Sequence, residues 1–421
     1  MSVPYEPESR QAWLRLALAL VVGTMACVGT WSVVVVLPTV QADFGSLRAG
    51  ASMPYAAAMI GFATGTLTMG RVADRYGVAP LIAAAGLCLF IGYAAAALSQ
   101  SLWQFTLIHL LIGIGAAAGF APLIADLSHG FVKHRGIAVT IAASGSYLAG
   151  ALWPQVIQLA LSSHGWRAIH AAIGIAALVV MLPLSLLFRS RPAETTMLEA
   201  ERVTQAARGD LAMSPRMLQT LLCLAGFACC VAMSMPQVHM VAYCSDLGYG
   251  VARGAEMLTL MFGLGILSRL GSGFIADRIG AVTTLLLGSA MQAVALFLYL
   301  WFDELTSLYV IAAVFGLFQG GIVPMYAVVI RDYLPPREAG ARIGLVLAAT
   351  ILGMAFGGYL AGAIFDLFGS YRVAFLNGLL WNILNIALVA WLMLNVGRHR
   401  LPLEGQREAP RRERLRLPHP P

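Results

Sequence analysis

Residues 257–280 read MLTLMFGLGILSRLGSGFIADRIG, an apolar run of helix length that contains one guanidinium and ends in a charged turn. The guanidinium belongs to Arg269, and Asp277, Arg278 and Gly280 form the turn. An arginine inside a membrane helix costs roughly 2.5 to 3.5 kcal/mol on insertion scales, so it persists only with a partner, a water-filled cavity or a function. We interpret Arg269 as a candidate contact for an anion.

The composition around this stretch is that of a polytopic membrane protein. Hydrophobic residues make up 59% of the chain and charged residues only 11%, whereas a soluble domain carries about 25% charged residues. A membrane-spanning helix needs about 20 mainly apolar residues. Twelve such runs lie near 13–38, 51–70, 79–99, 102–127, 137–161, 168–188, 217–243, 254–274, 281–301, 306–330, 341–365 and 373–396.

The even number of runs places both termini on one side of the membrane, and the basic residues indicate which side. All but five of the 27 lysines and arginines fall on the side of the termini; the exceptions are Arg48, Arg167, Arg253 and Arg372, and Arg269 inside its helix. Because basic residues concentrate in cytoplasmic loops, we expect both termini in the cytoplasm. The net charge of +7 then reflects topology and not affinity for nucleic acid. The arginine-rich, lysine-poor composition favours a bacterial inner membrane.

An internal repeat divides the chain. Gly70-Arg71-Val72-Ala73-Asp74-Arg75-Tyr76-Gly77 recurs 203 residues later as Gly273-Phe274-Ile275-Ala276-Asp277-Arg278-Ile279-Gly280. We expect an all-α membrane protein with twelve transmembrane helices in two pseudo-symmetric six-helix bundles. The predicted parts are an N-terminal half (1–188), a cytoplasmic linker (189–216), a C-terminal half (217–396) and a basic cytoplasmic tail (397–421).

The repeated GxxxDRxG turn resembles the major facilitator superfamily. Other stretches are similar to its monocarboxylate porter branch and the related oxalate/formate antiporters: Phe44-Gly45-Ser46-Leu47-Arg48, Arg135-Gly136-Ile137-Ala138, Gly165-Trp166-Arg167, 239–248 and Ser268-Arg269. The resemblance covers nearly the whole chain. It implies the major facilitator fold and secondary active transport of a small organic anion by alternating access.

The same resemblance implies a cytoplasmic latch that holds one state closed. Its residues would be Gly70, Asp74, Arg75, Gly77 and Asp126 in the first half and Gly273, Asp277, Arg278 and Gly280 in the second. We expect Gly70 and Gly77 to allow a close backbone approach in the turn. The basic pair that usually follows the last glycine is missing, since Val78-Ala79 follow Gly77. The alternative is a plain loop that sets the topology.

Arg269 has the chemistry of a carboxylate site because a guanidinium presents a rigid, bidentate fork. In the branch that this chain resembles, the matching arginine binds the substrate carboxylate. The alternatives are a structural ion pair with Asp126 or Glu256, or snorkelling to the interface. Proton-coupled animal members carry an aspartate four residues earlier, where this chain has Gly265, and a lysine in the first helix, whereas the only lysine here is Lys133. Neither a coupled proton nor a counter-anion follows from the sequence.

Further candidates for substrate binding are polar or aromatic residues at mid-helix depth: Trp31, Tyr55, Tyr147 and Gln319. His239 is expected near the outer end of its helix, and because a histidine side chain ordinarily titrates near physiological pH, it suits a proton or an anion. Each of these side chains is also compatible with simple packing between helices. The six cysteines lack metal-ligand spacing and are interpreted as packing residues.

The sequence contains no nucleotide-binding loop, metal cluster or catalytic spacing. We therefore expect no enzyme activity, no cofactor and no metal, but a monomeric carrier of small monocarboxylate-like anions in the lipid bilayer. The alternatives are an exporter of hydrophobic or cationic compounds and a membrane sensor with this fold that does not transport.

Overall fold

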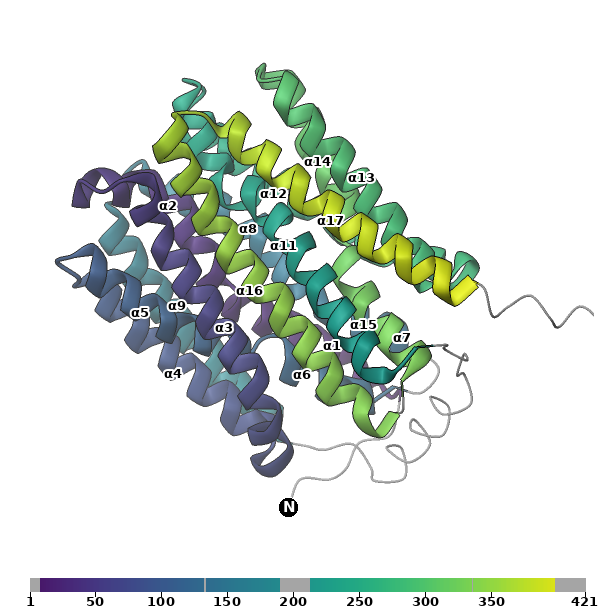
Figure 1. Cartoon of the computed structure of the whole chain (residues 1–421). Coiled ribbons are helices and arrows are strands. Elements are labelled where there is room, and N and C mark those ends of the chain that lie inside the picture. Colours follow the sequence, from purple (N-terminus) through teal and green to yellow (C-terminus); the bar gives the residue numbers. More distant parts are fainter. Residues whose placement is uncertain (1–7, 132–133, 190–212, 335, 398–421) are drawn as a thin grey trace, which may run out of the picture.

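The computed structural model describes residues 8–131, 134–189, 213–334 and 336–397 of the chain. These residues form a helical bundle (Figure 1). The predicted linker over 189–216 lies largely outside the described residues, and the predicted tail lies outside them beyond Gly397.

The described part contains sixteen helices. They are α1 (Arg10–Ala26), α2 (Val28–Phe44), α3 (Arg48–Tyr76), α4 (Val78–Ala97), α5 (Leu102–Ala117), α6 (Ala121–His129), α7 (Arg135–Ala143), α8 (Gly145–Leu161), α9 (Trp166–Leu187), α11 (Pro215–Asp246), α12 (Val251–Ile279), α13 (Ala281–Trp301), α14 (Leu305–Gln319), α15 (Ile322–Tyr333), α16 (Pro336–Phe368) and α17 (Tyr371–Gly397).

Four pairs of these helices are single crossings with an interruption inside the bundle: α1 with α2, α5 with α6, α7 with α8, and α14 with α15. The described residues therefore cross the bundle twelve times, as the twelve apolar runs predict. Eleven of these segments are long and apolar enough to span a membrane. The twelfth is α3, which has 29 residues and so extends about 43 Å at 1.5 Å per residue.

Large apolar side chains remain exposed around the outside of the bundle, among them Leu159, Val179 and Leu394. In a soluble protein such side chains would form an unusually extensive apolar surface. The described crossings are helical, and a helix forms most of its backbone hydrogen bonds within its own segment, as a lipid environment requires. Both features fit a multi-pass membrane protein.

The N-terminal six crossings lie on one side of the molecule and the C-terminal six on the other, from purple-blue to green-yellow in Figure 1. At their junction α3 lies beside α16, where a Cβ on Gly358 would come within 2.8 Å of the Tyr55 ring. Along a second junction α8 packs on α12, and a Cβ on Gly150 would come within 2.7 Å of the Phe262 ring. Glycine therefore brings the two halves into close contact along both seams.

The two ends of the bundle are distinguished by the connections between helices. The terminal end is the one at which α1 begins and α17 ends, and the opposite end carries the connection between α2 and α3. At the terminal end, the repeated turns place Gly77 at φ 89° and Gly280 at φ 87°, a region that favours glycine. Gly70 and Gly273 have no atom within 4 Å of a built Cβ, so the prediction that Gly70 allows a close backbone approach is wrong.

Candidate functional site

A cavity lies between the two halves, near the middle of the bundle. Its volume is about 100 Å³, on a scale where one water molecule needs about 10–15 Å³. The lining comes from both halves: Cys27, Thr30, Trp31, Met59, Phe62, Phe120, Ser146 and Tyr147 from the first, and Cys230, Met233, Gln237, Phe262, Arg269, Val323, Leu347, Thr350, Ile351 and Met354 from the second. A ligand in this cavity would contact both halves at once.

Arg269 is the charged member of this lining, and its side chain is only 4% exposed. Its Nε donates to the carbonyl oxygen of Gly320 at 3.2 Å, and its Nη1 donates to the carbonyl oxygen of Ala143. Its Cζ lies 4.1 Å from the centre of the Tyr147 ring. Among the described residues, no carboxylate lies within ion-pair distance of the guanidinium.

The two carbonyls that hold Arg269 come from the helix interruptions. Ala143 is the last residue of α7, and Gly320 follows the last residue of α14. The final carbonyls of a helix lack partners within that helix and carry the negative end of its dipole. These two helix ends therefore orient a buried cation while they leave its charge without a counter-ion.

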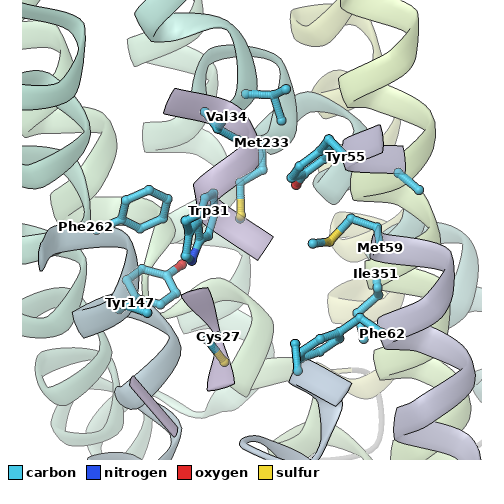
Figure 2. Close-up of a cluster of buried hydrophobic side chains, with 14 of the residues drawn as sticks. Cys27, Trp31, Val34, Tyr55, Met59, Phe62, Tyr147, Met233, Phe262 and Ile351 are labelled. Atoms are coloured by element: carbon cyan, nitrogen blue, oxygen red, sulfur yellow. The ribbon is translucent and has the colours of Figure 1, made fainter. Parts of the chain in front are cut away.

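An aromatic wall stands beside the guanidinium. The rings of Trp31 and Phe262 lie with their centres 4.2 Å apart, and the Trp31 indole nitrogen donates to the Ser146 carbonyl oxygen at 3.1 Å. Tyr147 packs edge-on against Phe262 at 5.4 Å. Figure 2 shows Trp31, Tyr147 and Phe262 grouped on one side of the apolar cluster. Two of the predicted site residues, Trp31 and Tyr147, thus lie with Arg269 at the cavity.

The structure gives a reason for glycine at position 265. A Cβ on Gly265 would come within 2.6 Å of Cδ1 of Tyr147. The Tyr147 ring therefore fills the space into which a larger side chain one helical turn before Arg269 would project.

Tyr55 and Gln319 are buried without exposure and do not appear in the cavity lining. Gln319 accepts a hydrogen bond from the amide of Gln237, which does line the cavity. The hydroxyl of Tyr55 has no hydrogen-bond partner among the described residues. Gln237 was not among the predicted site residues, although an amide within an apolar run beside Pro236 was a visible signal.

His239 lies away from the cavity, in a hydrogen-bonded chain near the opposite end. Its Nδ1 is 2.9 Å from the Tyr371 hydroxyl, and its Nε2 is 2.7 Å from the Gly358 carbonyl oxygen. Arg48 donates to the same Tyr371 hydroxyl at 3.1 Å and pairs with Asp246 at 3.0 Å. These contacts join the two halves at the opposite end of the bundle.

The predicted latch residues lie at the terminal end. Asp126 forms a buried, bidentate ion pair with Arg15, with contacts of 2.9 and 3.0 Å. Arg75 is exposed and lies over the Tyr76 ring, and Asp277 and Arg278 are also exposed. The side chain of Asp74 lies outside what the structure describes. The two acidic partners considered for Arg269 have other partners, because Glu256 pairs with Arg253 at 2.8 Å.

The cysteines form no disulfide, and the described residues contain no group of three or more potential metal ligands. Cys27 and Cys230 line the cavity from opposite halves. Together with Met59, Met233 and Met354 they make the apolar part of the lining unusually rich in sulfur, which suits a polarisable, flat ligand.

Comparisons with known proteins agree with the architecture. Residues 19–307 and 257–419 match the sequence profile described as the Major Facilitator Superfamily. The chain is 27% identical over 315 residues to monocarboxylate transporter 13 of Rattus norvegicus, an alignment that covers 72% of this chain and 71% of that protein. It is 24% identical over 319 residues to an agnestins efflux protein of Paecilomyces divaricatus, covering 75% and 71% respectively.

Solved structures show the same fold. The nucleoside transporter NupG superimposes with a TM-score of 0.70 at 14% identity, covering 91% of this chain and 99% of that one. A bacterial homologue of the human lysosomal transporter Spinster superimposes with a TM-score of 0.66 at 14% identity, covering 93% and 96%.

Proposed function

The chain belongs to the major facilitator superfamily, and on that premise we propose that it carries small organic anions with one carboxylate through the cavity between its halves. It is a multi-pass membrane transporter and not an enzyme.

The observation that carries the proposal is the unbalanced charge of Arg269. The guanidinium is buried, lines the cavity and has no described carboxylate at ion-pair distance. A buried charge is costly unless it is paired, and two helix ends offset only part of that cost, about 2 kcal/mol at most for one favourable helix end. A substrate carboxylate would supply the missing counter-ion.

The remaining lining restricts the charge of the substrate. Of the described residues around the cavity, Arg269 alone is charged. A second carboxylate would be buried without a cation, and an amine would find no anion. The lining therefore supports a monoanion and disfavours a cationic substrate. The apolar character of the lining also fits the alternative function, which is export of hydrophobic compounds. The two functions differ in whether substrate binding depends on Arg269.

Transport would follow the alternating access of two rocking halves. We assign the halves to residues 1–188 and 217–396, joined by 189–216 and followed by the tail 397–421. The contacts of Arg48 with Asp246 and Tyr371 close the opposite end, so substrate would reach the cavity from the terminal end. Basic residues concentrate at the terminal end, which we therefore place in the cytoplasm, in a bacterial inner membrane.

The remaining candidates other than Tyr55 and Gln319 have the following roles in this scheme. Trp31 and Tyr147 contact the substrate beside Arg269, whereas His239 belongs to the contacts that close the opposite end. Asp74, Arg75 and Asp126, with Gly70 and Gly77, form the latch of the first half, and Gly273, Asp277, Arg278 and Gly280 form that of the second. Transport of the anion would be coupled to a proton or to a counter-anion. The functional unit would be a monomer.

The direct test is binding of a monocarboxylate to the purified protein and to its Arg269→Ala variant. Loss of carboxylate binding in the variant supports the proposal. Binding confined to neutral or cationic compounds, and unaffected by the substitution, would instead support the exporter.

A further inference from the structure

Two buried polar groups lie in the part of the site that is remote from Arg269. Gln237 lines the cavity and is 1% exposed, and its amide donates to Gln319, which leaves Oε1 without a partner among the described residues. The hydroxyl of Tyr55 is likewise buried and without a described partner. A buried polar atom without a hydrogen bond is costly and calls for a ligand or a water molecule.

Gln237 lines the cavity, and the Tyr55 hydroxyl is directed at other residues of that lining. Figure 2 shows the hydroxyl of Tyr55 pointing toward the sulfur-containing side chains of Met233 and Met59, which line the cavity. Gln237 lies on the same helix as Met233, one helical turn further along. Because the Gln237 amide is fixed by Gln319, one of its polar atoms stays unpaired whichever way the two amides are oriented.

The two polar regions lie at different depths in the bundle. Arg269 is 18 residues from Val251, where α12 begins at the opposite end, a distance of about 27 Å along the helix. Gln237 is nine residues from Asp246, where α11 ends at that same end, or about 14 Å. Tyr55 is seven residues from Arg48, or about 10 Å. The ion pair of Arg48 with Asp246 shows that α3 and α11 have their ends at one level.

The space between the two regions is walled by apolar, polarisable groups. Trp31 and Phe262 stand there with ring centres 4.2 Å apart, and Met233 and Cys230 lie on the facing helix α11. Rings and sulfur atoms of this kind contact a flat aromatic body favourably.

We propose that Gln237 and Tyr55 bind a second, neutral polar group of the substrate, which is an aryl carboxylic acid with a hydroxyl or carbonyl on the ring end remote from its carboxylate. This inference rests on the proposed function, since Arg269 must hold the carboxylate. The distal group is neutral because no charged residue lies among the described lining residues at that end. A short aliphatic acid would satisfy Arg269 and leave both distal groups unpaired.

The test compares two ligands that differ by one hydroxyl, cinnamate and para-hydroxycinnamate, with lactate as the short acid. Dissociation constants are measured by calorimetry on the full chain in detergent, for the wild type and for Tyr55→Phe and Gln237→Met. Tyr55→Phe keeps the ring against Gly358 and removes only the hydroxyl. We expect the wild type to bind para-hydroxycinnamate roughly fivefold to tenfold more tightly than cinnamate, the worth of one buried hydrogen bond.

In both variants this preference should fall to about twofold or less, since the hydrogen bond that distinguishes the two ligands is weakened or lost. The preference is the ratio of the two Kd values measured on the same variant. A general loss of stability would affect both Kd values and would not by itself change this ratio. Equal binding of the two aryl acids by the wild type would overturn the inference, as would Arg269-dependent binding of lactate alone, and both results would leave the anion proposal standing. Failure of the proposed function looks different, because then Arg269→Ala would bind every acid as the wild type does.

Discussion

Asp366 caps α3 from the other half of the molecule, because its carboxylate accepts the backbone hydrogen of Arg48 at 2.9 Å. The second carboxylate oxygen accepts the backbone hydrogen of Ala49 at 2.7 Å. The first backbone N–H groups of a helix have no partner within it. Asp366 satisfies two of them only while the halves meet at the opposite end, so this contact favours the state that the structure shows.

Asp366→Asn should shift the protein toward opening at that end. Asparagine keeps one acceptor oxygen and replaces the other by an N–H donor, so one of the two capping hydrogen bonds is lost at a cost of about 1 kcal/mol, roughly a fivefold change in the ratio of the two states. The measurement is the distance distribution between spin labels at Leu98 and Phe302, which are exposed on the two halves. Asp303→Asn is the matched control, since Asp303 pairs with Arg372 within the C-terminal half and its loss should leave the distribution unchanged. No shift in Asp366→Asn would refute a gating role for this cap.

Gly265→Ala should weaken substrate binding and destabilise the protein, because the new Cβ would collide with Tyr147 and displace its ring from Arg269. Overpacking of this kind costs about 1–3 kcal/mol. Thermal unfolding and carboxylate binding are measured together. Gly263→Ala on the same helix is the control, since nothing lies within 4 Å of a Cβ built there. If the two variants behave alike, Tyr147 does not restrict position 265.

Asp126→Asn should destabilise the fold, because it removes the carboxylate charge that faces Arg15 in a pair whose side chains are only 4% and 11% exposed. Removing one partner of such a pair costs about 3–5 kcal/mol. The exposed pair of Arg167 with Asp43 provides the comparison, and Asp43→Asn should cost less than about 1 kcal/mol. The measurement is the unfolding temperature of each variant in detergent, compared with that of the wild type. If Asp126→Asn unfolds at the wild-type temperature, the pair of Arg15 with Asp126 adds nothing to stability in this state.

Much of the fold could be predicted because it depends on features that are local in the sequence. The apolar runs predict the twelve crossings of the bundle. The recurrence of the Gly70–Gly77 turn at Gly273–Gly280 predicts that these crossings form two halves. The interruptions inside the crossings could not be predicted in this way. The break between Ala143 and Gly145 has no proline, and it is held by contacts from distant helices, including the one from Arg269.

The site residues likewise fall into those that could be predicted from the sequence and those that could not. Arg269 stands out in the sequence because it is a charge in an apolar helix, and Trp31 and Tyr147 were candidates because polar and aromatic residues at mid-helix depth can line a cavity. The partner of His239 could not be predicted, because Tyr371 lies 132 residues away. Gln237 was missed although Gln319, also an amide within a helix, was a candidate; the pairing of the two amides and the unpaired atom of Gln237 depend on contacts between distant helices.

Ligand-induced thermal stabilisation tests most directly whether Arg269 binds the substrate carboxylate. It is measured for the wild type and for the variants Arg269→Lys, Arg269→Ala and Arg253→Ala. Arg253 lies on the same helix but is exposed and paired with Glu256, so its variant controls for loss of a charge. A ligand at a hundredfold excess over its Kd stabilises the folded state by about 2.7 kcal/mol.

Monocarboxylates should stabilise the wild type and Arg253→Ala. They should bind roughly tenfold to a hundredfold more weakly to Arg269→Ala, the worth of a charge-assisted hydrogen bond of about 1.5–3 kcal/mol, with Arg269→Lys in between because it keeps the charge without the bidentate fork. Undiminished stabilisation of Arg269→Ala by the same acids would contradict the account.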